Sequence, residues 1–214
     1  MEVTMDKKEM IAEIIKRLKK EYPVLKPALN FSSPFELLAA TILSAQTTDI
    51  QVNKVTEPLF KKYKSVKDFA NANPALLEQD VSSVNFYRNK ACNIQNAARM
   101  IIDKFGGEVP RTMSDLISLP GVARKTANIV LYNVYGIKEG IAVDTHVMRL
   151  SQRLGLTKND DPVKIEKELM EIVPKKDWGN ITHLLIFHGR NSCQAKKPKH
   201  QDCVLYDICP SRDI

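Results

Sequence analysis

The sequence predicts an all-α protein made of about ten short helices. Apolar residues recur at the spacing of one helical face, as Ile11, Ile14 and Leu18 do in the first such segment. No segment shows the sustained alternation of apolar and polar residues that is typical of a half-buried strand. The connections are short, and this pattern is compatible with two helical lobes and a cleft between them, although composition places no boundary.

Most of the expected helices have a start or stop signal in the sequence. Serine, threonine, aspartate and asparagine cap the first N–H groups of a helix, whereas glycine ends one. In chain order the signals are Ser33-Pro34-Phe35-Glu36 with a capping-box glutamate, Asp49, Asn73-Pro74, Gly106-Gly107 after a helix from Ile94 to Phe105, Thr112 with Asp115, Gly136 after a helix from Arg124 to Tyr135, Asp144, Gly155 and Asp161-Pro162. The last long helix is expected from Trp178 to His188.

Length and composition limit the class of protein. A chain of 214 residues fits one large domain or two small ones. It contains no stretch near the roughly 18 apolar residues of a membrane span, and its charged N-terminus lacks the apolar region of a signal peptide. We therefore expect an intracellular protein without a membrane partner. The net charge of +7 favours a polyanion such as nucleic acid, or it serves solubility alone.

The four cysteines are unevenly distributed: Cys193, Cys203 and Cys209 lie in the last 22 residues, and Cys92 lies alone. An intracellular chain is not expected to hold structural disulfides. Clustered thiols at short spacing therefore indicate a metal ion or an iron–sulfur cluster. Cys92 has no partner nearby in the sequence, and we expect it to be a buried structural thiol.

Residues 119–131 read LPGVARKTANIVL, which is the order of a helix, a Pro-Gly turn and a second helix. The tight turn needs the conformational freedom of glycine. The backbone N–H groups of Gly121, Val122 and Ala123 then lie at a helix start, where free N–H groups bind phosphate, and Arg124 adds positive charge. Such contacts hold a DNA backbone without reading its sequence. The alternative is an ordinary corner between two core helices.

Lys125 occupies the first turn of this second helix, where a cation is unfavourable. A free lysine is only about 0.04% neutral at pH 7, and an amine must be neutral to attack carbon. Lowering its pKa to 7 requires about 4 to 5 kcal/mol of destabilisation of the cation. The helix N-terminus, neighbouring Arg124 and a semi-buried pocket would supply this, so Lys125 is a candidate nucleophile. Alternatively, Lys125 points outward to phosphate.

Asp144 follows in the segment AVDTHVMRL, at the start of another expected helix. Aspartate is a favoured N-cap, and capping alone explains it. The functional alternative is a carboxylate that takes a proton from the lysine and stabilises a developing sugar cation. Both roles are compatible if one oxygen caps the helix and the other remains available.

At these residues the chain resembles the endonuclease III family of helix-hairpin-helix DNA glycosylases. LPGVARKTANIVL, AVDTHV, the cysteines after FHGRNSC, and residues 37–55 (LLAATILSAQTTDIQVNKV) carry the resemblance over nearly the whole chain. It implies a two-domain all-α fold with a DNA-binding cleft between the domains. A six-helix domain with the hairpin would cover residues 27–137, and residues 1–26 with 138–214 would form a domain that carries a cluster.

The resemblance implies a bifunctional enzyme of base excision repair that acts on double-stranded DNA. It removes an oxidised pyrimidine from a flipped nucleotide and then nicks the abasic site by β-elimination. Lys125 would form a Schiff base at C1′ with the help of Asp144. Gln46 would fill the gap in the duplex, and Phe86 would act as a wedge where the family more usually has leucine. For Phe86 the alternative is a core aromatic.

The tail CQAKKPKHQDCVLYDIC departs from the family pattern of four cysteines separated by six, two and five residues. The spacing is kept, but His200 occupies the second position. The resemblance implies a [4Fe-4S] cluster on Cys193, His200, Cys203 and Cys209, since imidazole also binds iron in Rieske centres. A zinc ion, a three-iron cluster and an empty site remain open as alternatives.

Lys196, Lys197 and Lys199 lie between the first two of these positions. A loop fixed by metal ligands presents such lysines to phosphate, whereas the alternative is a solvated lysine run. Three rival functions remain. A monofunctional mismatch glycosylase of the same fold would generally lack Lys125, and a non-catalytic DNA-binding module would not need Asp144 after it. A metal-dependent nuclease needs clustered carboxylates, which we do not find. We expect a monomer.

Overall fold

The computed structural model describes residues 6–25 and 27–212, and within these ranges all regular structure is helical. The all-α prediction is confirmed. The chain divides into two compact units, each with its own apolar core. We call Pro27–Ile137 the hairpin unit and Met1–Lys26 with Lys138–Ile214 the tail unit.

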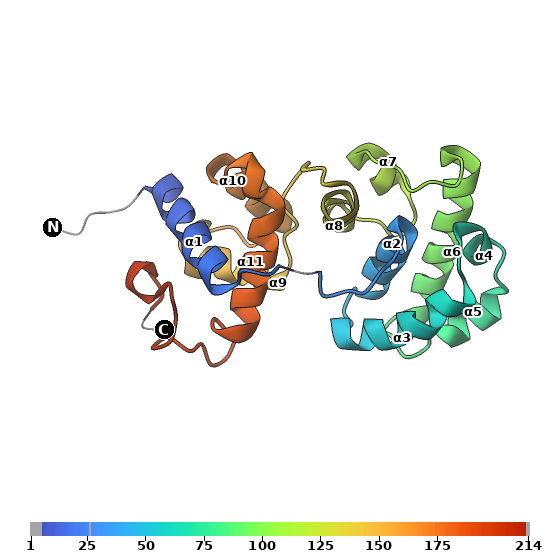
Figure 1. Cartoon of the computed structure of the whole chain (residues 1–214), viewed down its shortest axis with the longest axis horizontal. Coiled ribbons are helices and arrows are strands. Elements are labelled where there is room, and N and C mark those ends of the chain that lie inside the picture. The colour runs from blue at the N-terminus through green and yellow to red at the C-terminus, as the bar shows by residue number, and fades with distance from the viewer. Residues whose placement is uncertain (1–5, 26, 213–214) are drawn as a thin grey trace. The chain divides into compact units, whose positions relative to one another are not determined.

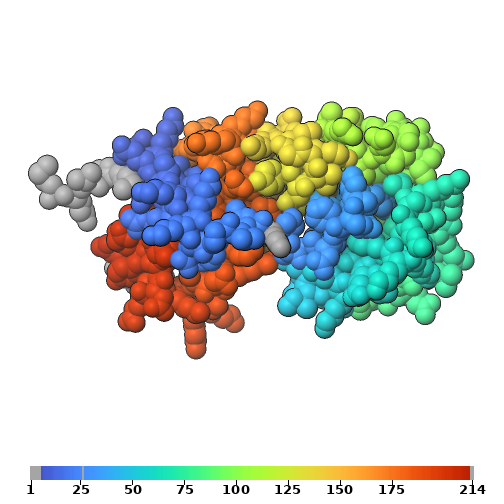
Figure 2. Space-filling model, viewed as in Figure 1, coloured from blue at the N-terminus to red at the C-terminus, as the bar shows by residue number. Residues whose placement is uncertain are grey.

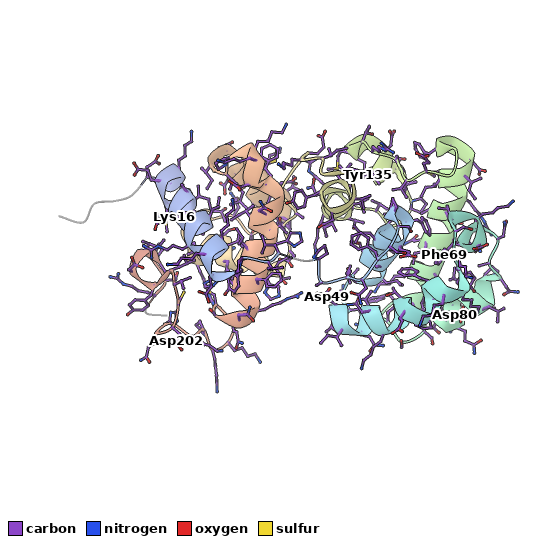
Figure 3. All side chains as sticks on the ribbon, viewed as in Figure 1. Lys16, Asp49, Phe69, Asp80, Tyr135 and Asp202 are labelled. Carbon is purple, nitrogen blue, oxygen red and sulfur yellow. The ribbon has the colours of Figure 1, made fainter. Side chains whose placement is uncertain are left out.

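The hairpin unit is organised around one long helix, α6, which packs on α4, α5 and α2 (Figure 1). Phe69, labelled in Figure 3, is almost fully buried, and the ring centroids of Phe35 and Tyr63 each lie 5.1 Å from its own. The helices of this unit are α2 (Pro34–Leu43), α3 (Asp49–Lys62), α4 (Val66–Ala70), α5 (Pro74–Asp80), α6 (Tyr87–Phe105), α7 (Met113–Ser118) and α8 (Arg124–Tyr135).

The tail unit packs α11 on α9 and on α1. The apolar face of α1 is buried as its periodicity predicts. The C-terminal segment, red in Figure 2, lies against α1, where Arg17 donates to the carbonyl of Val204 at 3.0 Å and pairs with Asp207. The helices of this unit are α1 (Lys7–Glu21), α9 (Thr145–Arg153), α10 (Pro162–Ile172), η1 (Lys175–Asp177), α11 (Trp178–Asn191) and η2 (Tyr206–Ile208).

Most predicted caps are confirmed: the side chains of Ser33, Asn73, Thr112, Asp144 and Asp161 each accept a hydrogen bond from the start of their helix. Glu36 bonds differently from the capping-box expectation, because its carboxylate accepts from the backbone N–H and the hydroxyl of Ser32.

Two expectations about single residues are wrong, and one short helix was missed. Thr48 rather than Asp49 caps α3, because its hydroxyl accepts from the N–H of Gln51 at 3.3 Å. Helix α4 was not anticipated. Cys92 is exposed on α6 rather than buried.

Within the described ranges no helix has both the length and the apolar composition needed to cross a membrane.

Candidate functional site

The turn between α7 and α8 requires glycine at its third position. The carbonyl of Leu119 accepts from the N–H of Val122 at 3.2 Å, and Gly121 has a φ of +76°. Proline followed by a residue with positive φ is the arrangement of a type II turn. A Cβ on Gly121 would also lie 2.9 Å from the Cβ of Asn93 on α6. The hairpin therefore packs directly on α6.

The hairpin offers fewer free N–H groups than the sequence predicted. The N–H of Val122 is used in the turn, and its side chain is buried in the core. The prediction of a free phosphate-binding N–H is therefore wrong for Val122. Ala123 is the N-cap of α8, and its side chain accepts no hydrogen bond from the helix. The N-cap residue of α8 thus supplies no side-chain acceptor for the first N–H groups of the helix, as suits an anion site.

We expect Gly121→Ala to destabilise the hairpin by about 1–2 kcal/mol from positive φ alone, with a further cost from the contact with Asn93. Gly136→Ala is the matched control, because Gly136 has a φ of +66° and open space where its Cβ would lie. Denaturant unfolding and DNA affinity measure the effect. Equal losses of stability in the two variants would contradict the close packing of the hairpin on α6.

Lys125 and Arg124 both lie in the first turn of α8, and both side chains are exposed. The semi-buried pocket expected around Lys125 is therefore not formed by the hairpin unit itself. The placement of Lys125 in the first turn of a helix is as predicted.

Asp144 caps α9 through a single oxygen. Its Oδ1 accepts from the N–H groups of His146 and Val147, each at 2.8 Å. These two bonds leave Oδ2 outside the cap. The half-buried carboxylate can thus stabilise the helix and keep one oxygen for chemistry.

Gln46 and Phe86 share an unusual backbone conformation. Their φ angles are +54° and +55°, and among the described residues they are the non-glycine positions with positive φ. Such conformations are sterically costly and cluster at functional sites. The Gln46 side chain is exposed, and Phe86 is 63% exposed. The alternative of Phe86 as a core aromatic is therefore wrong.

Lys90 is a residue that the sequence reasoning missed. It lies on α6, is only 5% exposed, and its ammonium group donates to oxygens next to Gln46. The available signal was its position four residues before Ile94, on the apolar face of the helix. A charged residue on a core stripe is rarely buried without a partner.

Cys193, His200, Cys203 and Cys209 line one pocket of the tail unit. Burial raises the pKa of Cys203 and Cys209, and repulsion from Cys193 adds to both shifts, so the three thiols lie close enough to affect one another. In the portion of the chain that the structure describes, no three His, Cys, Asp or Glu side chains converge on the site of a single metal ion.

Arg153 of α9 connects this pocket to the lysine-rich loop. It donates to Sγ of Cys193 at 3.2 Å and to the carbonyls of Gln194 and Ala195 at 2.8 and 2.9 Å. The loop is therefore held at its start by α9. The lysines that follow are all exposed: Lys196, Lys197 and Lys199.

Residues 39–175 match the family described as HhH-GPD superfamily base excision DNA repair protein. An endonuclease III from Synechocystis sp. is 51% identical, with 96% of this chain and 94% of that protein aligned. The endonuclease III of Bacillus subtilis is 48% identical, with 88% and 86% aligned.

Solved structures give the same result. A trapped endonuclease III–DNA covalent intermediate superposes with a TM-score of 0.91 at 45% identity, over 96% of each chain. A thermostable thymine-DNA glycosylase has a TM-score of 0.83 at 23% identity over 97% of each chain, and this likeness concerns the fold alone. The chain therefore belongs to the HhH-GPD superfamily of base excision DNA repair proteins and, within it, to the endonuclease III family.

Proposed function

We propose that this protein is a bifunctional DNA glycosylase and abasic-site lyase that removes oxidised pyrimidines from double-stranded DNA. The observation that carries the proposal is its 45% identity, over 96% of each chain, to an endonuclease III trapped covalently on DNA. Covalent trapping requires an enzymatic nucleophile, which a monofunctional glycosylase or a binding module does not supply.

In the proposed reaction, neutral Nζ of Lys125 attacks C1′ of the flipped nucleotide. The bond between C1′ and the base breaks, and its electron pair leaves with the base. Oδ2 of Asp144 takes the proton that the nitrogen loses. The bond between C1′ and O4′ then breaks, O4′ takes its electron pair and a proton, and a Schiff base forms on the opened sugar. Loss of a 2′ proton then expels the 3′ phosphate. The bound nucleotide excludes water from Lys125 and supplies burial that the hairpin unit lacks.

The proposed DNA contacts fall into two groups. Backbone N–H groups of Gly121 and Ala123, with Arg124, bind phosphate at the uncapped start of α8. The second group comprises Lys196, Lys197 and Lys199, which bind phosphate through their charge. Each phosphate that they neutralise makes the DNA affinity fall more steeply as the salt concentration rises. Gln46 fills the gap left by the flipped base, and Phe86 separates the neighbouring stacked bases.

We also propose that Cys193, His200, Cys203 and Cys209 bind a [4Fe-4S] cluster. The four side chains share a pocket, and the guanidinium of Arg153 next to Cys193 suits a thiolate. Zinc on the same four side chains is the alternative that metal content distinguishes. When bound, the cluster would fix the shape of the lysine-rich loop.

Metal analysis tests the cluster. We expect about four irons and four sulfides per chain, fewer in His200→Ala, and full iron in His200→Cys with a lower reduction potential, because histidine ligation raises the potential. One zinc per chain would contradict the cluster, and an iron content unchanged in His200→Ala would contradict ligation by His200. Lys197→Ala, next to the same site, is the control.

Strand incision tests the activity. The protein is incubated with a 5′-labelled duplex that contains thymine glycol, an oxidised pyrimidine. We expect cleavage on the 3′ side of the lesion without further treatment. An excised base with an intact strand, cut only by hot alkali, would support a monofunctional glycosylase instead. Binding without excision of any lesion would support a non-catalytic module.

A further inference from the structure

Hydrogen bonds join the Gln46 loop to the Phe86 loop within the hairpin unit. Nδ2 of Asn85 donates to the carbonyl of Gln46 at 2.5 Å, and the N–H of Asn85 donates to Oγ1 of Thr47 at 3.3 Å. Gln51 adds a bond from Nε2 to Oγ of Ser83 at 2.9 Å. The segment that begins at Gln46 and the segment that leads into Phe86 are therefore linked to each other.

Lys90 holds the same junction from inside. Its Nζ donates to the carbonyls of Leu43 and Ala45 at 2.7 and 2.6 Å, and to Oγ1 of Thr47 at 3.2 Å. An ammonium group has three N–H donors, and all three are used on neutral oxygens. Burial lowers the pKa of Lys90, which is the expected cost of a cation out of water.

A purely structural role does not account for all of these bonds. A lysine near the C-terminus of α2 would stabilise that helix through the carbonyl of Leu43 alone. The bonds to Ala45 and Thr47 lie beyond the helix end, on either side of Gln46. An apolar residue of similar volume would fill a buried site at lower cost. The polar contacts therefore serve the geometry of the loop.

We propose that Lys90 and Asn85 are positioning residues, forming a clamp that holds Gln46 and Phe86 as one preformed unit for insertion into the DNA stack. The inference deepens the proposed function and rests on it, because it assigns the clamp to the base-flipping step. Preorganisation of this kind removes the need to order two loops when DNA binds. Without the clamp, each strained residue relaxes separately, and the duplex is opened less often.

The test compares substrates that do and do not require opening of a stack. Lys90→Met replaces the ammonium group with an apolar side chain of similar length. Asn85→Ala removes the bond from Nδ2 to the carbonyl of Gln46 at an exposed position, where folding is not at risk. Asn89→Ala, an exposed asparagine on the same helix, is the control. We expect excision of thymine glycol from duplex DNA to slow by roughly tenfold or more in both clamp variants, as misplacement of positioning groups does.

Nicking of a single-stranded abasic substrate should be unchanged in both variants, because no stacked neighbours must be separated. Equal losses on the two substrates would show a structural or chemical role and overturn the clamp. Undiminished duplex excision would overturn it as well. When Phe86→Ala is already present, Asn85→Ala should slow duplex excision little further, because the effects of substitutions at coupled residues are not additive.

A fluorescent base tests the clamp without any chemistry. 2-Aminopurine placed opposite the lesion brightens when its stack is opened, so wild type and Asn89→Ala should raise its fluorescence on binding, and the clamp variants should not. Equal brightening in all four proteins would overturn the clamp. If wild type opens the stack but does not nick abasic DNA, the proposed lyase function fails while the clamp stands.

Discussion

We expect Lys125→Gln to abolish borohydride trapping of the protein on duplex DNA that contains thymine glycol. An amide nitrogen has no available electron pair for attack on C1′, so no Schiff base forms and borohydride has nothing to reduce. The rate of excision should fall by at least ~10³-fold, as loss of a nucleophile does in other enzymes. Lys125 is exposed, and the substitution leaves the core intact. A band of reduced mobility on a denaturing gel measures trapping.

Arg124→Gln is the matched control for this experiment. It removes a neighbouring positive charge from the same helix turn and keeps the amine, so trapping should persist at saturating protein while DNA affinity falls and its salt dependence weakens. A trapped band that survives in Lys125→Gln would exclude Lys125 as the nucleophile.

Asp144→Asn should separate the two roles of this side chain. Asparagine caps a helix about as well as aspartate, so thermal stability should change by less than about 0.5 kcal/mol. The amide cannot accept a proton or stabilise a sugar cation, and single-turnover excision should slow by roughly 10²–10⁴-fold. Stability is measured by thermal unfolding and the rate by quenched time courses at saturating protein.

Two further variants make this result decisive. Asp144→Ala should lose the rate and also about 1 kcal/mol of stability, because the cap is gone. Asp161→Asn is the control, because Asp161 caps α10 by accepting from the backbone N–H of Lys164 at 2.8 Å. This variant should change neither the excision rate nor the stability. Full activity in Asp144→Asn would mean that the aspartate is only a helix cap.

Helix boundaries were predictable wherever a local interaction sets them. The cap of Thr112 on Asp115 and the stop at Gly136 involve residues within one turn, so the sequence shows both partners. Asp49 was misassigned because its neighbour Thr48 is also a favoured cap, and the slightly stronger intrinsic preference for aspartate does not decide between adjacent candidates. Helix α4 spans five residues, too few to reveal a period, although Ser65 and Asp68 form a capping box.

The candidate site was predictable only in part, for the same physical reason. Lys125 and Asp144 are marked by their placement at helix starts, which the sequence displays. The contacts of Lys90 with Ala45 and Thr47 join segments more than 40 residues apart, and no local pattern encodes them. The use of the Val122 N–H within the turn likewise depends on how the turn closes.

Three features of the hairpin unit are spaced along the first part of α6. Phe86 is the N-cap just before the helix, Lys90 reaches the Gln46 loop, and Asn93 lies against Gly121 of the hairpin. Lys90 and Asn93 are neighbours on the helix surface, and the interval from Phe86 to Asn93 spans about 10 Å at 1.5 Å per residue. The length and register of α6 thus set the spacing between segments that are distant from one another in sequence. One residue inserted within this interval would rotate the rest of α6 by about 100° relative to Phe86. The loops can therefore change in amino-acid composition, whereas the number of residues between positions 86 and 93 is constrained.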